Sequence, residues 1–477
     1  MKSQVPGVLN GAHIAADPAP VPEMADAALS PPEDRRSIAR RIGRNVGIVV
    51  TGNAAVAGFG VITLALNARA LGTAGLGVLA LILTIATLVD RIAAFQTWQP
   101  LVKLGADALA AGDKRRVGQL LTVALLFDVI AAMAAAVAAV LIVLLAGERL
   151  GIPAEYLGVA AIYVATLVTR IADAPAGVMR LFDRFGLLTT LRAGEAAVQC
   201  LAAAILFTLS APLGAYVLSF AGVAVATNVA LLACVLHLGA RAGVTPAVRC
   251  VGAAWAAEWR AFWAFSWTLN IASTINTVRQ RSPVLLIGAL LGPAAVGIYH
   301  VAERVVGVLV MAMWSFHQAL YPEAARLATS RRRADLLWFV QRIGAICGGI
   351  GVSALLGAVT LGHIVVLVAG GGDYGQAYWP LVLLVASCSI ALSGIGLHSV
   401  VLVTAGPGKV LKAHLLPFLV LVPVLPLATL QFGIAGAAGA HIVYEALWLA
   451  IMGTEFYRWR GRDRRFASDK GIDHVSA

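Results

Sequence analysis

Charged residues are scarce in this chain of 477 residues: 13% of the residues are charged, whereas 60% are hydrophobic. A soluble domain usually carries about 25% charged residues. The hydrophobic residues form long apolar runs that alternate with short clusters of Arg and Lys. No soluble core can bury so many continuous apolar stretches, so the composition excludes an ordinary soluble protein and indicates a chain that folds in a lipid bilayer.

Several motifs are also absent. The five cysteines are scattered and show no CxxC or CxxH spacing, which argues against a disulfide framework and a zinc site. No GxSxG, Walker or HExxH motif occurs, so we expect neither an enzyme nor an ATP-driven pump, and no metal or cofactor. Residues 1–34 lack the basic start and apolar centre of a signal peptide, and their Ala, Pro and acidic residues predict a disordered cytoplasmic tail.

The apolar runs predict an all-α polytopic membrane protein. Each span requires about 20 apolar residues. Divided at Gly and Pro, the runs give twelve spans, at 43–68, 76–98, 118–146, 154–177, 187–209, 212–237, 263–290, 295–320, 337–368, 377–403, 412–431 and 434–456. One set of loops carries nearly all the Arg and Lys clusters, whereas the opposite loops hold only Arg69 and Arg149. This asymmetry predicts that both termini are cytoplasmic, and it explains the net charge of +12 better than a nucleic-acid partner.

The second half of the sequence repeats landmarks of the first. The segment LGTAGLG at 71–77 follows the first span and LGPAAVG at 291–297 follows the seventh, at an offset of 220 residues. Gln99-Pro100 and Tyr321-Pro322 end the second and eighth spans, at an offset of 222. Six spans separate the landmarks, so two parallel six-helix repeats with a cavity between two lobes are predicted.

The domains predicted from this repeat are a tail at 1–34, an N-terminal lobe at 35–238, a linker at 239–262, a C-terminal lobe at 263–457 and a basic cytoplasmic tail at 458–477. In the linker region, Trp255, Trp259 and Trp263 recur every four residues beside Arg249 and Arg260. This pattern is typical of an amphipathic helix in the membrane interface.

Ionisable residues inside the spans are the candidates for function, because an ionised side chain at mid-bilayer costs about 2.5–3.5 kcal/mol on insertion scales. The candidates for binding an anionic substrate are Arg91, Arg279, Arg281, His300 and Arg304. The candidates for ion coupling are Asp90, Asp128, Glu303, His441 and Glu445. A carboxyl group in a low-dielectric site gains a proton more readily, which suits such coupling. The alternative for each residue is a satisfied polar contact between helices.

The seventh span carries Arg279 and Arg281 close to Pro283. Proline has no backbone N–H, so a kink is expected there. Two guanidinium groups beside a kink can hold a diphosphate bidentately, while the alternative is that one of them pairs with Glu303 or Asp128. In the fourth span, Arg170 and Asp173 are three residues apart, so we expect them to form a structural pair on one helix face.

The chain resembles the Wzx-type oligosaccharide flippases of the multidrug/oligosaccharidyl-lipid/polysaccharide exporter superfamily. The resemblance runs over about residues 35–460, and it is carried by the basic start Arg35–Arg44 leading into Asn53, by Asn67–Gly72 with Gly75–Gly77, by Leu291–Pro293, by Val296–Tyr299 and by Tyr321–Leu327. It implies a pair of six-helix lobes in a V, as in MATE transporters, in the bacterial inner membrane. It also implies alternating access, cation coupling and movement of a polyprenyl-diphosphate-linked oligosaccharide to the periplasmic leaflet for O-antigen, capsule or exopolysaccharide synthesis. Membrane lipids, a polysaccharide polymerase and a chain-length regulator would be its partners.

Three alternatives remain at the level of sequence. A cation-coupled multidrug or small-molecule exporter could share the fold, although extruders of cationic drugs should have an acidic cavity rather than intramembrane arginines. A lipid II flippase would share the substrate chemistry. A membrane-embedded glycosyl polymerase or ligase would need a large external loop, and the longest external loops here, at 145–153 and 369–376, are short.

Overall fold

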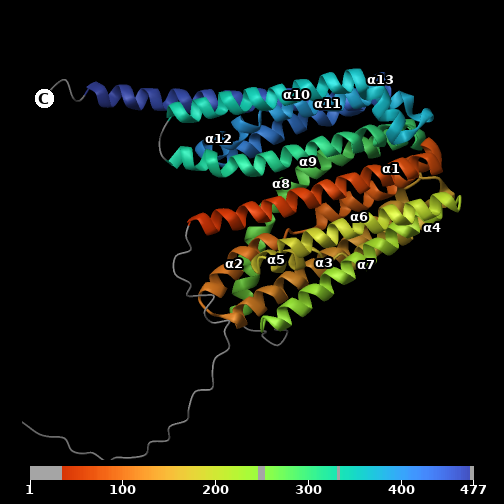
Figure 1. Cartoon of the computed structure of the whole chain (residues 1–477), viewed down its shortest axis with the longest axis horizontal. Coiled ribbons are helices and arrows are strands. Elements are labelled where there is room, and N and C mark those ends of the chain that lie inside the picture. The colour runs from red at the N-terminus through yellow and green to blue at the C-terminus, as the bar shows by residue number, and fades with distance from the viewer. Residues whose placement is uncertain (1–34, 245–252, 330–332, 473–477) are drawn as a thin grey trace, which may run out of the picture. The chain divides into compact units, whose positions relative to one another are not determined.

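The computed structural model describes residues 35–244, 253–329 and 333–472 (Figure 1). Contacts divide the chain into residues 1–44 and residues 45–477, and the description below concerns the second unit. The three described ranges are almost entirely helical and contain no strand. The predicted all-α class is therefore confirmed.

The N-terminal lobe follows the predicted order of spans. Its elements are α1 (Arg35–Ala93), α2 (Trp98–Ala110), α3 (Lys114–Ala146), α4 (Ala154–Ala165), η2 (Thr166–Thr169), α5 (Asp173–Leu181), α6 (Phe185–Thr208) and α7 (Leu213–Arg241). In Figure 1, α3, α4, α6 and α7 run alongside one another, and α4 packs against both α3 and α7. The helix α1 covers the first span and the second span as far as Ala93, and the two spans meet at Gly72. The predicted end of the second span is wrong, because residues 94–97 are not helical. Gly72 has a φ of 65°, a left-handed conformation that glycine adopts without steric cost.

The C-terminal lobe contains the remaining elements: α8 (Ala253–Leu291), α9 (Pro293–Thr329), α10 (Arg333–Gly370), η3 (Gly372–Ala377), α11 (Tyr378–Ser393), α12 (Ile395–Ala405) and α13 (Pro407–Ile472). The helix α13 covers the last two spans, which meet at Gly433. Within the described ranges, nine helices are long and apolar enough to cross a membrane, and both α1 and α13 are among them. The predicted seventh span, 263–290, carries charges and lies within α8. The other predicted spans also fall on described helices, so each of the twelve has a helical counterpart.

The backbone repeats the offset that the sequence predicts. Gly72 and Gly292, 220 residues apart, both have a positive φ. The same is true of Gly151 and Gly371, again 220 residues apart. Corresponding junctions of the two halves therefore adopt the same unusual backbone conformation, which is direct structural support for a duplicated architecture.

The two lobes meet at a seam made of matching residues, Thr73 and Gly77 from the first half and Pro293 and Gly297 from the second. A Cβ atom on Gly77 would overlap the carbonyl oxygen of Pro293, and one on Gly297 would overlap the carbonyl oxygen of Thr73. The same two Cβ atoms would lie 3.0 Å from the nitrogen of Gly297 and 3.1 Å from the nitrogen of Gly77, respectively. The contact is reciprocal, so we call these four residues the glycine seam.

Hydrogen bonds beside the glycine seam also join the lobes. The Arg69 Nη2 group donates to the carbonyl oxygen of Val368 at 2.8 Å. The Tyr374 hydroxyl donates to the carbonyl oxygen of Ala68 at 3.2 Å. On the charge pattern of the loops, these contacts lie at the predicted periplasmic ends of the spans.

The first half of α8 packs on the N-terminal lobe. Trp259 stacks on Phe127 with ring centroids 4.1 Å apart, and Phe262 is fully buried in the same hydrophobic cluster. The Asn270 amide donates to the carbonyl oxygen of Ala94 at 2.8 Å. At least one of the tryptophans expected in the membrane interface therefore has a protein partner. The start of that segment, 249–252, and the side chain of Trp255 lie outside the described part of the chain, and the interfacial placement stays a prediction.

Candidate functional site

A cavity of about 860 Å³ lies in the C-terminal lobe. Its walls come from α8, α9, α11, α12 and α13, and Gln96 and Gln99 of the N-terminal lobe complete them. Among the predicted site residues, those that line it are Arg279, Arg281, Glu303, Arg304, His441 and Glu445. Charged residues from α8, α9 and α13, which are far apart in sequence, thus surround a single space.

Arg279 is held at the cavity wall by three side chains. Its Nη1 atom lies 3.1 Å from Glu445 Oε1, and its Nη2 atom donates to Asn276 Oδ1 at 3.2 Å. Its guanidinium carbon lies 4.5 Å from the centre of the Tyr444 ring, a cation–π contact. Its Nε atom makes no hydrogen bond to any described residue. This donor is buried, so the polar contacts of the guanidinium are made by its two terminal nitrogens.

A second group of charges lies on α8 and α9. Arg281 Nη1 lies 3.2 Å from Glu303 Oε1, and Glu303 Oε2 lies 3.4 Å from His300 Nδ1. The Arg304 Nε atom donates to His300 Nε2 at 3.5 Å. His300 itself is buried behind the wall. Arg304 is exposed and forms no ion pair with a described residue, so its charge is directed at the cavity.

The arrangement bears on the alternatives that the sequence left open. Arg281 does pair with Glu303, as the structural alternative proposed, and yet both partners line the cavity. The helix α8 continues through Pro283 without a break, so the predicted kink stays a prediction. Both Arg279 and Arg281 reach the cavity from this uninterrupted helix.

Sequence reasoning missed several residues of this wall: Gln96, Gln99, Asn276, Gln280, His398, His414, Tyr444 and Trp448. His414 Nδ1 and the Tyr444 hydroxyl are 2.9 Å apart. The ring of His414 also stacks on Trp448 with centroids 5.9 Å apart. Tyr444 and Trp448 share a helix face with the predicted His441 and Glu445, because residues three and four apart are neighbours on a helix. This helical spacing could have identified Tyr444 and Trp448 as residues of the cavity wall.

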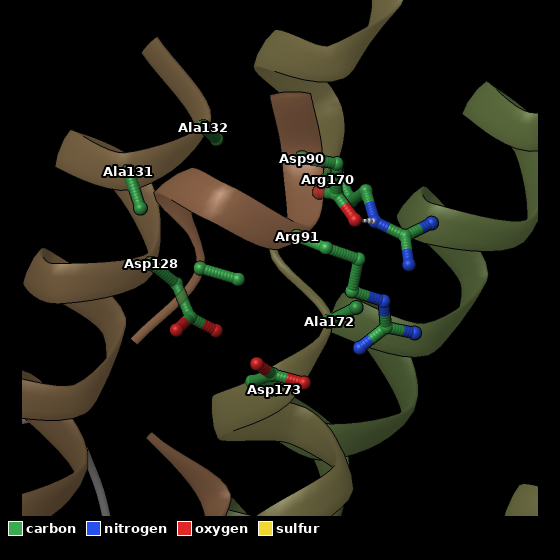
Figure 2. A pocket seen from close by; sticks show the side chains of 9 residues that line it. Asp90, Arg91, Asp128, Ala131, Ala132, Arg170, Ala172 and Asp173 are labelled. Carbon is green, nitrogen blue, oxygen red and sulfur yellow. Dashed lines mark ion pairs between the residues drawn. The ribbon is translucent and has the colours of Figure 1, made fainter. Parts of the chain in front are cut away.

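The remaining predicted residues, Asp90, Arg91 and Asp128, lie in the N-terminal lobe around a much smaller cavity of about 20 Å³, room for a single water molecule (Figure 2). Arg170 and Asp173 complete its charged lining. Arg170 Nε lies 2.7 Å from Asp90 Oδ2. The expected pair between Arg170 and Asp173 is therefore wrong: the chain leaves helical geometry between η2 and α5, so the two residues do not share a helix face.

Asp128 is a structural anchor in this lobe. It is 6% exposed, and its two oxygens accept hydrogen bonds from the Thr97 hydroxyl at 2.6 Å and from the Ala174 backbone N–H at 2.7 Å. These donors precede α2 and begin α5, respectively. The carboxylate thus joins three segments and satisfies an N–H at a helix start, where negative charge is favourable.

No group of three or more His, Cys, Asp or Glu side chains with the geometry to hold a metal ion occurs among the described residues.

The comparisons with known proteins give the family. The model of the family described as polysaccharide biosynthesis protein matches residues 42–328, which is more than half of the chain. The chain belongs to the polysaccharide biosynthesis protein family. This family member is 23% identical over 347 residues to the inner membrane protein YghQ of Escherichia coli (strain K12), and the match covers 71% of this chain and 95% of that relative.

Solved structures show the same fold. An inward-facing MATE family multidrug resistance transporter of the MOP superfamily aligns with a TM-score of 0.69 at 13% identity, over 91% of this chain and all of that one. The lipid II flippase MurJ in an inward closed conformation aligns with a TM-score of 0.67 at 8% identity, over 85% of this chain and 86% of that one. This polysaccharide biosynthesis protein is therefore a multi-pass helical membrane protein with the fold of MOP-superfamily transporters.

Proposed function

We propose that this protein is a flippase, not an enzyme, that moves a polyprenyl-diphosphate-linked oligosaccharide from the cytoplasmic to the periplasmic leaflet of a bacterial inner membrane. The product would serve surface polysaccharide synthesis, with a polymerase and a chain-length regulator as downstream partners. The observation that carries the proposal is the cavity of about 860 Å³, into which Arg279, Arg281 and Arg304 extend from membrane-embedded helices. The family assignment and the inner-membrane relative support it.

The chemistry of the cavity suits a diphosphate. Guanidinium groups bind phosphate oxygens through paired N–H donors, and these bonds are strong where water is excluded. In the structure Arg279 and Arg281 are neutralised by Glu445 and Glu303. An incoming diphosphate would exchange with these carboxylates, and the carboxylates would take the arginines back when the substrate leaves. The guanidinium groups of Arg279 and Arg281 would then have an anionic partner in either state.

A flippase must also close the cavity on one side of the membrane, and the glycine seam is suited to this closure. It brings the lobes into backbone contact at the predicted periplasmic ends. Release of substrate on that side would require the seam to part, as in alternating access between parallel repeats.

A multidrug exporter is the weaker candidate, because three arginines in the cavity disfavour a cationic drug. Lipid II carries the same diphosphate, so the arginines do not separate it from other lipid-linked saccharides. Transport assays with each lipid would separate them.

The test is the double variant Arg279→Ala/Arg281→Ala. Charge-assisted hydrogen bonds contribute about 1.5–3 kcal/mol each, so losing both guanidinium groups should lower transport about 100-fold or more. Surface polysaccharide would be measured by immunoblot, together with the amount of protein in the membrane fraction. The matched control is Arg149→Ala/Arg342→Ala, which removes two exposed arginines that do not line the cavity. Normal polysaccharide in the first variant would refute the arginine site.

A further inference from the structure

The chain between α1 and α2 takes an unusual path beside the cavity. Gln96 has a φ of 49°, in the left-handed region that a residue with a Cβ atom rarely adopts. Of the three described residues other than glycine with positive φ, which are Gln96, Asp183 and Ser210, only Gln96 lines the cavity. Residues in rare backbone conformations cluster at functional sites when the surrounding structure holds them in place. The conformation of Gln96 therefore indicates a role in the cavity.

Contacts on both sides hold this segment in place. The Asn270 amide of α8 donates to the carbonyl oxygens of Ala94 at 2.8 Å and of Ile92 at 3.4 Å. One residue after Gln96, the Thr97 hydroxyl donates to Asp128 at 2.6 Å. The segment is therefore fixed by α8 on one side and by α3 on the other, with Gln96 between the two anchors.

The side chain of Gln96 forms a pair with that of Gln99. The Gln99 Nε2 group donates to Gln96 Oε1 at 2.9 Å, and both residues line the cavity. The pair uses one donor group and one acceptor. Whichever way the two amides are oriented, it leaves one NH₂ group and one carbonyl oxygen without a partner among the described residues.

A second set of neutral polar groups faces the same cavity from α8. Ser273, Asn276 and Gln280 line it, and Gln280 Nε2 donates to Asn276 Oδ1 at 3.3 Å. The same Asn276 oxygen accepts from Arg279. The amides of α8 are therefore contiguous with the cationic part of the wall.

The chemistry of these amides differs from that of the arginines. A diphosphate only accepts hydrogen bonds, so it cannot bond to the free carbonyl oxygen of the glutamine pair, which is also an acceptor. A sugar hydroxyl both donates and accepts, and a neighbouring donor and acceptor match it. We propose that Gln96 and Gln99, together with Asn276 and Gln280 in the lining of the same cavity, form a saccharide subsite for the sugar next to the diphosphate. This inference rests on the proposed function and specifies which part of the substrate the N-terminal lobe would recognise.

The test removes the Gln96 amide by a substitution that does not strain the backbone. Gln96→Gly removes the amide and at the same time relieves the left-handed backbone, since glycine adopts this φ freely. The variant would be purified in lipid nanodiscs, and its affinity would be measured for polyprenyl diphosphate without sugar and for the polyprenyl-diphosphate-linked oligosaccharide isolated from the host. We expect about tenfold weaker binding of the saccharide-linked lipid, unchanged binding of the bare lipid and an unchanged or higher melting temperature.

Further variants define the outcomes. Gln96→Gly/Gln99→Ala should weaken binding of the saccharide-linked lipid up to about 100-fold, and the control Gln431→Ala, at an exposed residue outside the cavity lining, should have no effect. Equal binding of the saccharide-linked lipid by wild type and double variant would overturn the saccharide subsite and leave the flippase proposal intact. Equal weakening of both lipids would overturn it as well, because the pair would then only shape the cavity. A wild type that binds neither lipid would overturn the proposed function and this inference together.

Discussion

The glycine seam allows a direct test of lobe movement. Gly77→Ala adds one methyl group where the carbonyl oxygen of Pro293 already lies, and Gly297→Ala adds one against the carbonyl oxygen of Thr73. Neither obstacle is a flexible side chain, so the two backbones must separate. We expect each variant to destabilise the closed seam and to shift the lobes towards the open arrangement.

The size of the shift follows from the cost of overpacking. Extra methyl groups in a well-packed contact cost about 1–3 kcal/mol. Because 1.4 kcal/mol corresponds to a factor of ten, the ratio of open to closed molecules should rise about 5- to 150-fold. The two substitutions act on one contact, so the double variant should show less than the sum of the single effects.

The assay is a distance measurement across the seam in a background without cysteine. Spin labels at Glu148 and Asp373, exposed positions in the corresponding loops of the two halves, would report a longer distance population in both variants. Gly60→Ala is the matched control, since a Cβ atom there meets open space in the same helix, α1. Unchanged distance distributions in folded Gly77→Ala and Gly297→Ala protein would refute the seam as a closing contact.

Two further predictions concern single carboxylates. Glu445→Gln removes the charge that competes for Arg279, so the variant should bind polyprenyl diphosphate about tenfold more tightly and transport it more slowly. Binding would be measured in nanodiscs and transport by the amount of surface polysaccharide. Weaker binding would contradict the exchange mechanism. Asp128→Ala leaves the Ala174 N–H and the Thr97 hydroxyl without their partner, which should destabilise the protein by about 1–3 kcal/mol in a thermal unfolding assay; an unchanged melting temperature would exclude the anchoring role.

Much of the fold was predictable because the bilayer imposes a simple rule on sequence. Long apolar runs must become helices in lipid, so the span positions could be read from these runs and from the Gly and Pro residues that divide them. The repeat was predictable for a different reason. Gly72 and Gly292 lie at junctions whose positive φ favours glycine, so the same residue type occurs at both positions.

The site was only partly predictable. Intramembrane charges are conspicuous, so Arg279, Arg281 and Glu445 could be named in advance, but a sequence does not show which charges meet. The pairing of Arg170 with Asp90 depends on the interruption between η2 and α5. The amides and histidines of the wall were missed because uncharged polar residues are common in spans, and their role depends on the face they share.

The helix α8 belongs to both lobes. Its first half is part of the aromatic core of the N-terminal lobe, and its second half carries Arg279. With a rise of 1.5 Å per residue, Arg279 lies roughly 13 Å along the helix axis from Asn270, whose amide donates to the N-terminal lobe at Ala94. One continuous helix thus connects that lobe to Arg279, so we predict that tilting the lobe would move the guanidinium group with it. If the protein is the flippase proposed above, opening the passage and changing its affinity for the cargo would be one mechanical event.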